Sequence, residues 1–202
     1  MTPLEAHLLF ATAWLTFAAV HSLLAGESAK RRLRPRLGAF YRLVYNVVAV
    51  AHLSLVWLVG RWTLGGADPF ALPPGARTAV DAIEVVGWLL LLVGLRGYDL
   101  GRLVGARQIR NRRRGIDEPE DEPLRLDGLH RYVRHPLYAG AMLILWGRAV
   151  DPFGVATAVW GTAYMLVGTW FEERKLLRLY GEAYAAYRRR VPAFLPWKGR
   201  AV

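Results

Sequence analysis

The 202-residue chain contains no cysteine. This absence excludes disulfides, thiolate metal ligands and a cysteine nucleophile. Acidic residues are also scarce, with 16 Asp and Glu against 27 Lys and Arg, and the formal net charge is +11. Such a basic excess is typical of proteins that contact nucleic acid or a membrane. Residues 1–6 contain no Lys or Arg, so we expect no secretory signal and expect the first apolar run to remain as a membrane anchor.

Apolar residues are abundant, at 54% of the chain, and they are arranged in long runs. A run near 20 residues matches a hydrocarbon core of about 30 Å at about 1.5 Å per helical residue. This match favours a membrane protein and argues against a nucleic-acid-binding one. The sequence therefore predicts an all-α integral membrane bundle of five transmembrane helices, at about His7–Leu24, Phe40–Gly60, Val80–Leu100, Pro136–Val150 and Gly154–Phe171.

The last two predicted spans are short and form a helical hairpin, followed by a cytoplasmic helical extension. Asp151-Pro152 is a turn signal between them, and we expect Arg148 to pair with Asp151. Lys and Arg are concentrated in residues 25–40, 96–138 and 172–202. Positive charge favours the cytoplasmic side, so we expect a multi-pass inner-membrane protein with its N-terminus outside and its C-terminus in the cytoplasm.

We interpret residues 1–202 as one integral membrane domain, with an N-terminal three-helix part at 1–100 and a C-terminal part at 125–197. Residues 101–129 form the one long polar connection, basic at Arg110–Arg114 and acidic at Asp117–Glu122. A solvated loop is the simplest interpretation, and attraction of the basic half to anionic lipid is a second one.

Glycines recur every seven residues in the third and fifth predicted spans. Seven residues are about two helical turns, so each set is expected to share one face, where small residues let membrane helices approach closely. Packing alone explains such a face, and a gap that admits a flat ring is the alternative. The two sets are Gly87, Gly94 and Gly101, and Gly154, Gly161 and Gly168.

Charged and aromatic residues gather at the cytoplasmic ends of the last two predicted spans. Pro136 suits the first helical position, so free N–H groups beside Arg134 favour a bound carboxylate or phosphate. Anchoring of Arg134 and His135 to lipid headgroups is the alternative. Glu172 and Glu173 need partners, either arginines or a cationic ligand. If that helix continues, one stripe contains Glu173, Leu177, Tyr180, Tyr184, Tyr187 and Val191.

These residues carry a family resemblance. Arg134-His135-Pro136-Leu137-Tyr138-Ala139-Gly140, then Glu172-Glu173 with Leu176, then Tyr180-Gly181, Tyr184, Tyr187 and Val191-Pro192 follow in order. Together they resemble the C-terminal half of the isoprenylcysteine carboxyl methyltransferase superfamily, which contains membrane enzymes that use S-adenosylmethionine. Residues 21–25 and 41–46 are more similar to its NnrU-like and methanethiol S-methyltransferase branches.

The resemblance implies an S-adenosylmethionine-dependent membrane methyltransferase with a small-molecule or lipid acceptor and without nucleic acid or metal. It implies catalytic roles for Glu173 and Arg134. The implied cofactor-binding residues are Arg134, His135, Pro136, Tyr138, Gly140, Glu172, Glu173, Tyr184 and Tyr187. One departure concerns the acceptor: the family often has arginine where this chain has Ala193.

Several alternatives stay open at this point. The acceptor is a lipophilic molecule or a small thiol or carboxylate, and an acceptor that must lose a proton has Glu173 or His135 as its candidate base. A nonenzymatic NnrU-like accessory protein or a small transporter is the alternative function. Haem ligation by histidines is disfavoured, because His21 and His52 are expected at different depths.

Overall fold

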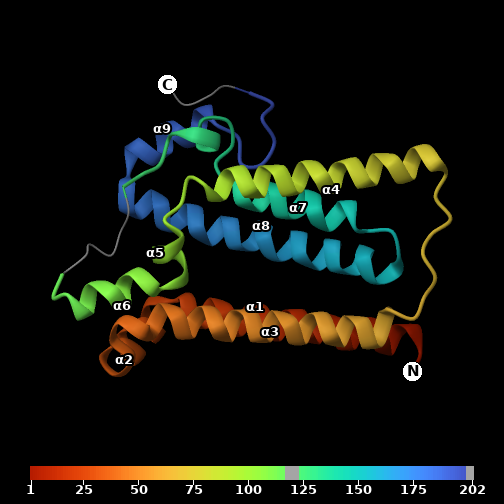
Figure 1. Ribbon diagram of the computed structural model, residues 1–202, viewed down its shortest axis with the longest axis horizontal. Helices are drawn as coiled ribbons and strands as arrows, with labels where there is room; N and C mark the ends of the chain where they lie inside the picture. The colour runs from red at the N-terminus through yellow and green to blue at the C-terminus, as the bar shows by residue number, and fades with distance from the viewer. Residues whose placement is uncertain (117–122, 199–202) are drawn as a thin grey trace. The chain divides into compact units, whose positions relative to one another are not determined.

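The computed structural model describes residues 1–116 and 123–198. These residues form nine α-helices and two short 3-10 helices, and they contain no strand (Figure 1). The all-α prediction is confirmed. The described residues fall into two compact units, 1–67 with 99–116 and 68–98 with 123–198. The predicted acidic stretch at 117–122 lies outside the described residues.

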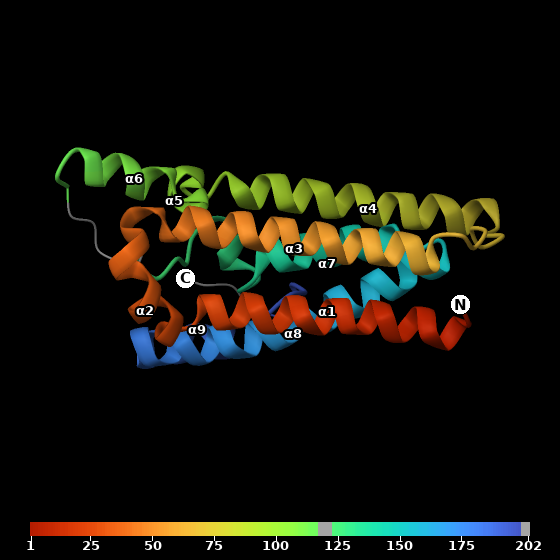
Figure 2. The same cartoon turned by 90° about the horizontal axis from the view of Figure 1, so that it is seen from below.

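The first unit is built on α1 (Pro3–Ala25) and α3 (Tyr41–Leu64), which pack side by side (Figure 2). Thr2 and Glu5 form a capping box at the start of α1, which satisfies backbone donors that the helix itself leaves free. The buried side chains include Phe10, Phe17 and Val56. Their burial stabilises the pair of helices.

Two histidines of this unit contact hydroxyl groups. Tyr45 Oη lies 2.5 Å from His21 Nε2, and Thr16 Oγ1 lies 3.4 Å from His52 Nε2. Each imidazole therefore has a polar neighbour across the interface between α1 and α3.

Shorter helices complete the first unit: α2 (Glu27–Leu37), the 3-10 helix η1 (Gly38–Phe40), α5 (Leu100–Val104) and α6 (Ala106–Arg113). The prediction of a solvated loop from residue 101 is therefore wrong for residues 101–113. Asp99 caps α5 by accepting a hydrogen bond from the Arg102 N–H, at 2.9 Å. Gly105, with φ 96°, then turns the chain from α5 into α6.

The second unit contains α4 (Pro74–Leu95) and α7 (Pro136–Gly147), which pack antiparallel through glycines. A Cβ atom on Gly87 would lie 2.7 Å from the Ile144 N atom, and one on Gly140 would lie 2.9 Å from the Leu91 N atom. This approach supports the packing interpretation of Gly87. Gly101 lies beyond the end of α4, so the expected single face of three glycines is wrong.

The hairpin continues into α8 (Pro152–Tyr180). Asp151 accepts a hydrogen bond from the Gly154 N–H at 2.6 Å and so caps this helix. Arg148 instead forms an ion pair with Glu84 of α4, at 2.9 Å. The predicted pairing of Arg148 with Asp151 is wrong, because the helix cap takes the carboxylate.

A break follows α8 at Gly181, whose φ is 56°, and α9 (Glu182–Arg190) begins after it. The helix therefore continues past Phe171 only as far as Tyr180, and one unbroken helix does not carry the whole stripe. Tyr184, Tyr187 and Val191 nevertheless form a buried cluster, on which partly buried hydrophobic residues pack: Leu124, Leu176, Leu177 and Tyr180. The turn at Gly181 brings the two halves of the stripe together.

Three helical stretches in the described residues are long and apolar enough to cross a membrane: Pro3–Ala25, Glu27–Leu64 and Pro74–Leu95. The helix α7 is apolar but shorter, at 12 residues. A count of five spans stays a prediction.

Candidate active site

Arg134, His135 and Glu173 meet within the second unit. Arg134 Nε and Nη2 lie 2.7 Å and 2.5 Å from Glu173 Oε1, and His135 Nε2 lies 3.1 Å from the same oxygen. These side chains are 11%, 6% and 12% exposed for Arg134, His135 and Glu173 respectively. The turn before α7 is thus joined to the C-terminal part of α8 by a nearly buried charged network.

The backbone near Val191 holds this turn in place. The N–H groups of Arg134 and His135 donate to the carbonyl oxygens of Pro192 and Ala193, at 2.9 Å and 3.0 Å. Arg134 Nη1 also donates to the Val191 carbonyl. Pro136 begins α7 and leaves His135 with φ −124°, a non-helical conformation that proline imposes on its predecessor.

The network decides the charge of Glu173. Burial alone raises the pKa of the Glu173 carboxyl, but hydrogen bonds from His135 and Arg134, together with the charge of Arg134, hold it below its ordinary value. The carboxylate is therefore the stable form. Its second oxygen, Oε2, has Arg188 Nη1 at 3.8 Å, so this oxygen is less fully engaged than Oε1.

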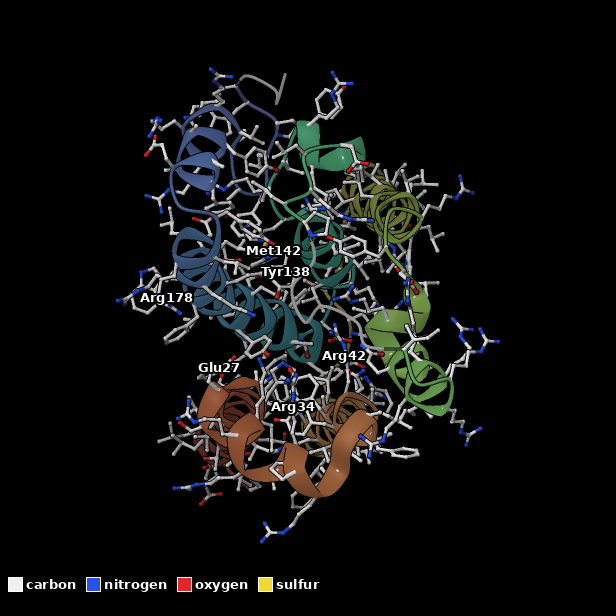
Figure 3. All side chains as sticks on the ribbon, turned by 90° about the vertical axis from the view of Figure 1, so that its left-hand side faces the viewer. Glu27, Arg34, Arg42, Tyr138, Met142 and Arg178 are labelled. Carbon is white, nitrogen blue, oxygen red and sulfur yellow. The ribbon has the colours of Figure 1, made fainter. Side chains whose placement is uncertain are left out.

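His135 is held on several sides. Because Nε2 donates to Glu173, Nδ1 is the acceptor nitrogen of the neutral ring. Nδ1 lies 3.7 Å from Glu172 Oε2, beyond hydrogen-bond range. The Tyr138 ring stacks on the imidazole with a centroid separation of 5.8 Å. Tyr138 and Met142 lie one helical turn apart on α7, as labelled in Figure 3.

The two tyrosines of α9 differ in their hydrogen bonding. Tyr187 donates to the His130 carbonyl at 2.6 Å. The Tyr184 hydroxyl is buried and has no hydrogen-bond partner within 1–116 and 123–198. Burial raises the pKa of both tyrosines well above its ordinary value, so both hydroxyls keep their protons.

A mostly apolar cavity of about 790 Å³ adjoins the network. Its walls come from α4, α7 and the segment after α9, and Arg134 and Lys198 contribute its positive charge. The other walls include Met142, Trp146 and Phe194. Small-molecule sites typically have volumes of roughly 300–1,000 Å³, so this cavity is large enough for an organic ligand.

A family model described as "NnrU protein" matches residues 9–149. The chain belongs to the NnrU family. The relationship expected from the sequence is confirmed. The family match includes Arg134 and His135 and ends before Glu173.

Similar proteins extend the relationship over most of this NnrU-family chain. A protein named methanethiol S-methyltransferase from Mycobacterium tuberculosis is 33% identical over 190 residues, covering 91% of this chain and 75% of the relative. One of the same name from Crocosphaera subtropica is 35% identical over 197 residues, with 91% and 72% covered. Nurim from Xenopus laevis is 24% identical over 159 residues, with 74% and 55% covered. No solved structure matches. The methyltransferase relatives support a membrane methyltransferase.

The NnrU-family structure places most predicted site residues around Glu173. Arg134 and His135 contact its carboxylate, Glu172 Oε2 lies 3.7 Å from His135 Nδ1, and Tyr138 stacks on His135. Tyr184 and Tyr187 lie in the adjoining buried cluster. Pro136 begins α7, whereas Gly140 lies at the close crossing with α4. The need for a glycine at position 140 is therefore explained by helix packing.

The sequence interpretation missed His130 and Tyr98. His130 Nδ1 donates to the Arg134 carbonyl at 3.1 Å, and the Tyr98 hydroxyl lies 2.9 Å from His130 Nε2. Burial lowers the pKa of His130, which favours its neutral ring. The sequence offered one signal for this pair, a histidine four residues before Arg134. Tyr98 gave no signal, because it lies 32 residues before His130.

Proposed function

We propose that this protein is an S-adenosylmethionine-dependent methyltransferase of the inner membrane. The observation that carries the proposal is the convergence of Arg134, His135 and Glu173 in one charged network beside an organic-sized cavity. The relatives named methanethiol S-methyltransferase support a thiol as acceptor. A lipophilic thiol or carboxylate belongs to the same proposal, because the cavity is mostly apolar.

The residues fit the charges of such a donor. Its amino-acid end has a carboxylate and an ammonium group, and its ribose has hydroxyls. Glu172 and the Oε2 atom of Glu173 are suitable acceptors for the ammonium or for the hydroxyls, because neither oxygen is saturated. Arg134 and Arg188 are the cations available for the carboxylate. The buried Tyr184 hydroxyl, beside Arg134, is a further polar group available to the donor.

We assign His135 as the candidate base for a thiol acceptor. A thiol must lose its proton before it is an effective nucleophile. The hydrogen bond from Nε2 to Glu173 leaves Nδ1 free to accept that proton, and the Glu173 carboxylate stabilises the resulting imidazolium. When bound, S-adenosylmethionine supplies an electrophilic methyl group. The chain's remaining task is to align the acceptor and exclude water.

The apolar cavity is the proposed acceptor site. Ala193 lines it beside Arg134. At this position the isoprenylcysteine carboxyl methyltransferase superfamily, which the chain resembles, often has arginine. An alanine there removes one cation from the cavity. This composition favours an acceptor whose bulk is neutral and apolar.

The membrane arrangement is part of the proposal. The N-terminus lies outside and the C-terminus in the cytoplasm, with α7 and α8 supplying the fourth and fifth spans of one membrane domain. The positive charges of α6 and α9 support this orientation. A cysteine-accessibility map tests it directly, because the natural chain has no cysteine.

Two measurements test the function. Protein purified in detergent is titrated with S-adenosylhomocysteine by calorimetry, and labelled methyl transfer is then measured with thiols, carboxylates and lipid extracts. We expect saturable binding that Glu173→Gln abolishes, and labelling of at least one thiol. Absence of binding would sink the proposal; binding without labelling of any acceptor would favour the nonenzymatic alternative.

A further inference from the structure

The first unit carries a basic surface that the proposed chemistry does not use. It consists of the exposed arginines of α2 and α6, together with the arginine that directly follows α6. We call it the α2/α6 basic surface and define it by Arg31, Arg32, Arg34, Arg36, Arg110, Arg112, Arg113 and Arg114.

Contacts within this unit hold the two separated segments together. Arg42 Nε and Asn46 Nδ2, both on α3, donate to the Leu103 carbonyl of α5 at 3.1 Å and 3.0 Å. The backbone at Gly105 is packed on α3, since a Cβ there would lie 2.7 Å from the Leu43 N atom. These contacts fix the short α5 and, through the turn at Gly105, the start of α6.

The far part of α6 reaches the end of α2. The Arg112 guanidinium lies over Gly38, which ends α2 with φ 53°, and a Cβ on Gly38 would come within 3.4 Å of Arg112 Nη1. The helix α6 also packs on η1. Segments about 70 residues apart in sequence therefore form one surface, and Figure 3 labels Arg34 and Arg42 in this region.

Most of the charge on this surface is not neutralised by described neighbours. Glu27 pairs with Lys30, and Asp99 pairs with Arg107. Both of these basic residues flank the surface and are outside its definition. Within the described residues, ion pairs and hydrogen bonds are absent for the side chains of Arg32, Arg36, Arg110, Arg113 and Arg114.

The position of the surface identifies its partner. The helix α2 directly follows α1 and leads into α3, two helices long and apolar enough to cross a membrane. Its arginines are therefore held at the level where a span meets lipid headgroups. Clustered arginines next to a span attract anionic phospholipids, and guanidinium groups bind phosphate oxygens in two-point contacts. We infer that the α2/α6 basic surface is a binding site for anionic phospholipid headgroups.

The test measures lipid preference with the full-length chain. Protein in zwitterionic detergent is mixed with nanodiscs that contain phosphatidylcholine alone or phosphatidylcholine with phosphatidylglycerol, and bound lipid is counted by native mass spectrometry and titration. We expect retention of phosphatidylglycerol over phosphatidylcholine, which raised salt weakens. Equal retention of both lipids would overturn the inference.

Paired variants test whether α2 and α6 act as one surface. Arg32→Gln with Arg36→Gln removes two charges from α2, and Arg110→Gln with Arg113→Gln removes two from α6. We expect each pair to weaken phosphatidylglycerol binding, and all four substitutions to weaken it by roughly tenfold or more. If only one pair of substitutions weakens phosphatidylglycerol binding, the inference that α2 and α6 form one binding surface is wrong.

Control variants separate this site from charge in general. Four glutamine substitutions at exposed arginines of the second unit remove the same charge, and we expect them to leave phosphatidylglycerol binding within about twofold; an equal loss would contradict a local site. Lysine at all four substituted positions of the α2/α6 basic surface should retain most of the binding. A loss of binding in this variant, with the fold intact, would contradict recognition by charge. The control positions are Arg96, Arg131, Arg178 and Arg190.

Discussion

Arg134 and Glu173 are paired through a single carboxylate oxygen. Two guanidinium nitrogens, Nε and Nη2, approach Oε1 at 2.7 Å and 2.5 Å, while Oε2 lies 3.8 Å from Arg188 Nη1. One oxygen of Glu173 is thus committed to the fold and the other faces a weaker contact. This division lets one residue serve both stability and ligand binding.

Replacing Glu173 tests both roles. Glu173→Gln keeps the shape of the side chain but leaves the Arg134 charge without its partner, and we expect a loss of roughly 3 kcal/mol in unfolding free energy. We also expect binding of S-adenosylhomocysteine to fall at least about tenfold, which corresponds to about 1.4 kcal/mol. Melting temperature and calorimetry measure the two effects. Glu182→Gln on exposed α9 is the matched control, and an equal effect there would contradict the assignment.

Acid should weaken the protein through the same residue. The pKa of Glu173 is lower in the folded chain than its ordinary value of 4.5, so its stabilising contribution is present above that value and is lost as pH falls through the folded pKa. We expect the melting temperature of the natural chain to decrease below about pH 4.5. Glu173→Gln should show a smaller decrease; parallel curves for both proteins would refute this account.

Two glycines make a matched pair for the helix crossing. Gly140→Ala places a Cβ 2.9 Å from the Leu91 N atom and 3.0 Å from the Gly87 O atom, so we expect a destabilisation of about 1–3 kcal/mol. Gly168→Ala in α8 meets no atom within 4 Å. It should be neutral or stabilise by up to about 1 kcal/mol, because alanine favours a helix. Thermal unfolding of the two variants in detergent measures both effects. An unchanged stability of Gly140→Ala would contradict the close packing.

His130 is expected to position the turn that contains Arg134. Tyr98→Phe removes the hydroxyl beside His130 Nε2 but leaves the His130 bond to the Arg134 carbonyl. His130→Ala removes both contacts, so we expect a larger loss of stability, about 1–3 kcal/mol, and weaker binding of S-adenosylhomocysteine. If His130→Ala binds as the natural chain does, the contact with Arg134 has no positioning role.

Ala193 should influence the choice of acceptor. Ala193→Arg adds a cation beside Arg134 in a cavity that Arg134 and Lys198 already line. We expect kcat/KM to fall for a neutral alkyl thiol. The ratio of kcat/KM for a thiol that carries a carboxylate to kcat/KM for the neutral thiol should rise by about tenfold. An unchanged ratio of the two kcat/KM values would place the acceptor elsewhere.

Local sequence signals predicted several features correctly. Pro136 begins a helix because its ring already has helical φ and its missing N–H is not needed there. Asp151-Pro152 marks the start of α8 for a similar reason, with the carboxylate as cap. The order of apolar runs placed helices at α1, α3, α4, α7 and α8. These signals act over a few residues and are visible in the sequence itself.

Other features depended on contacts between distant residues. The sequence did not indicate that Arg148 would meet Glu84, nor that α6 would pack beside the end of α2. Gly181 was part of the recognised pattern, but its positive φ, which ends α8, became evident only from the backbone. Tyr98 was missed because its partner His130 lies 32 residues away.

The sequence by itself determined the helical class and the apolar runs, because hydrophobic length and local capping are properties of neighbouring residues. It also determined the family, through motifs whose order can be compared with other proteins. Only the tertiary structure decided that Arg134, His135 and Glu173 share one carboxylate oxygen and that an apolar cavity adjoins them. Glu173 is far from Arg134 and His135 in the sequence, and they meet only because the helices pack and the chain turns between them.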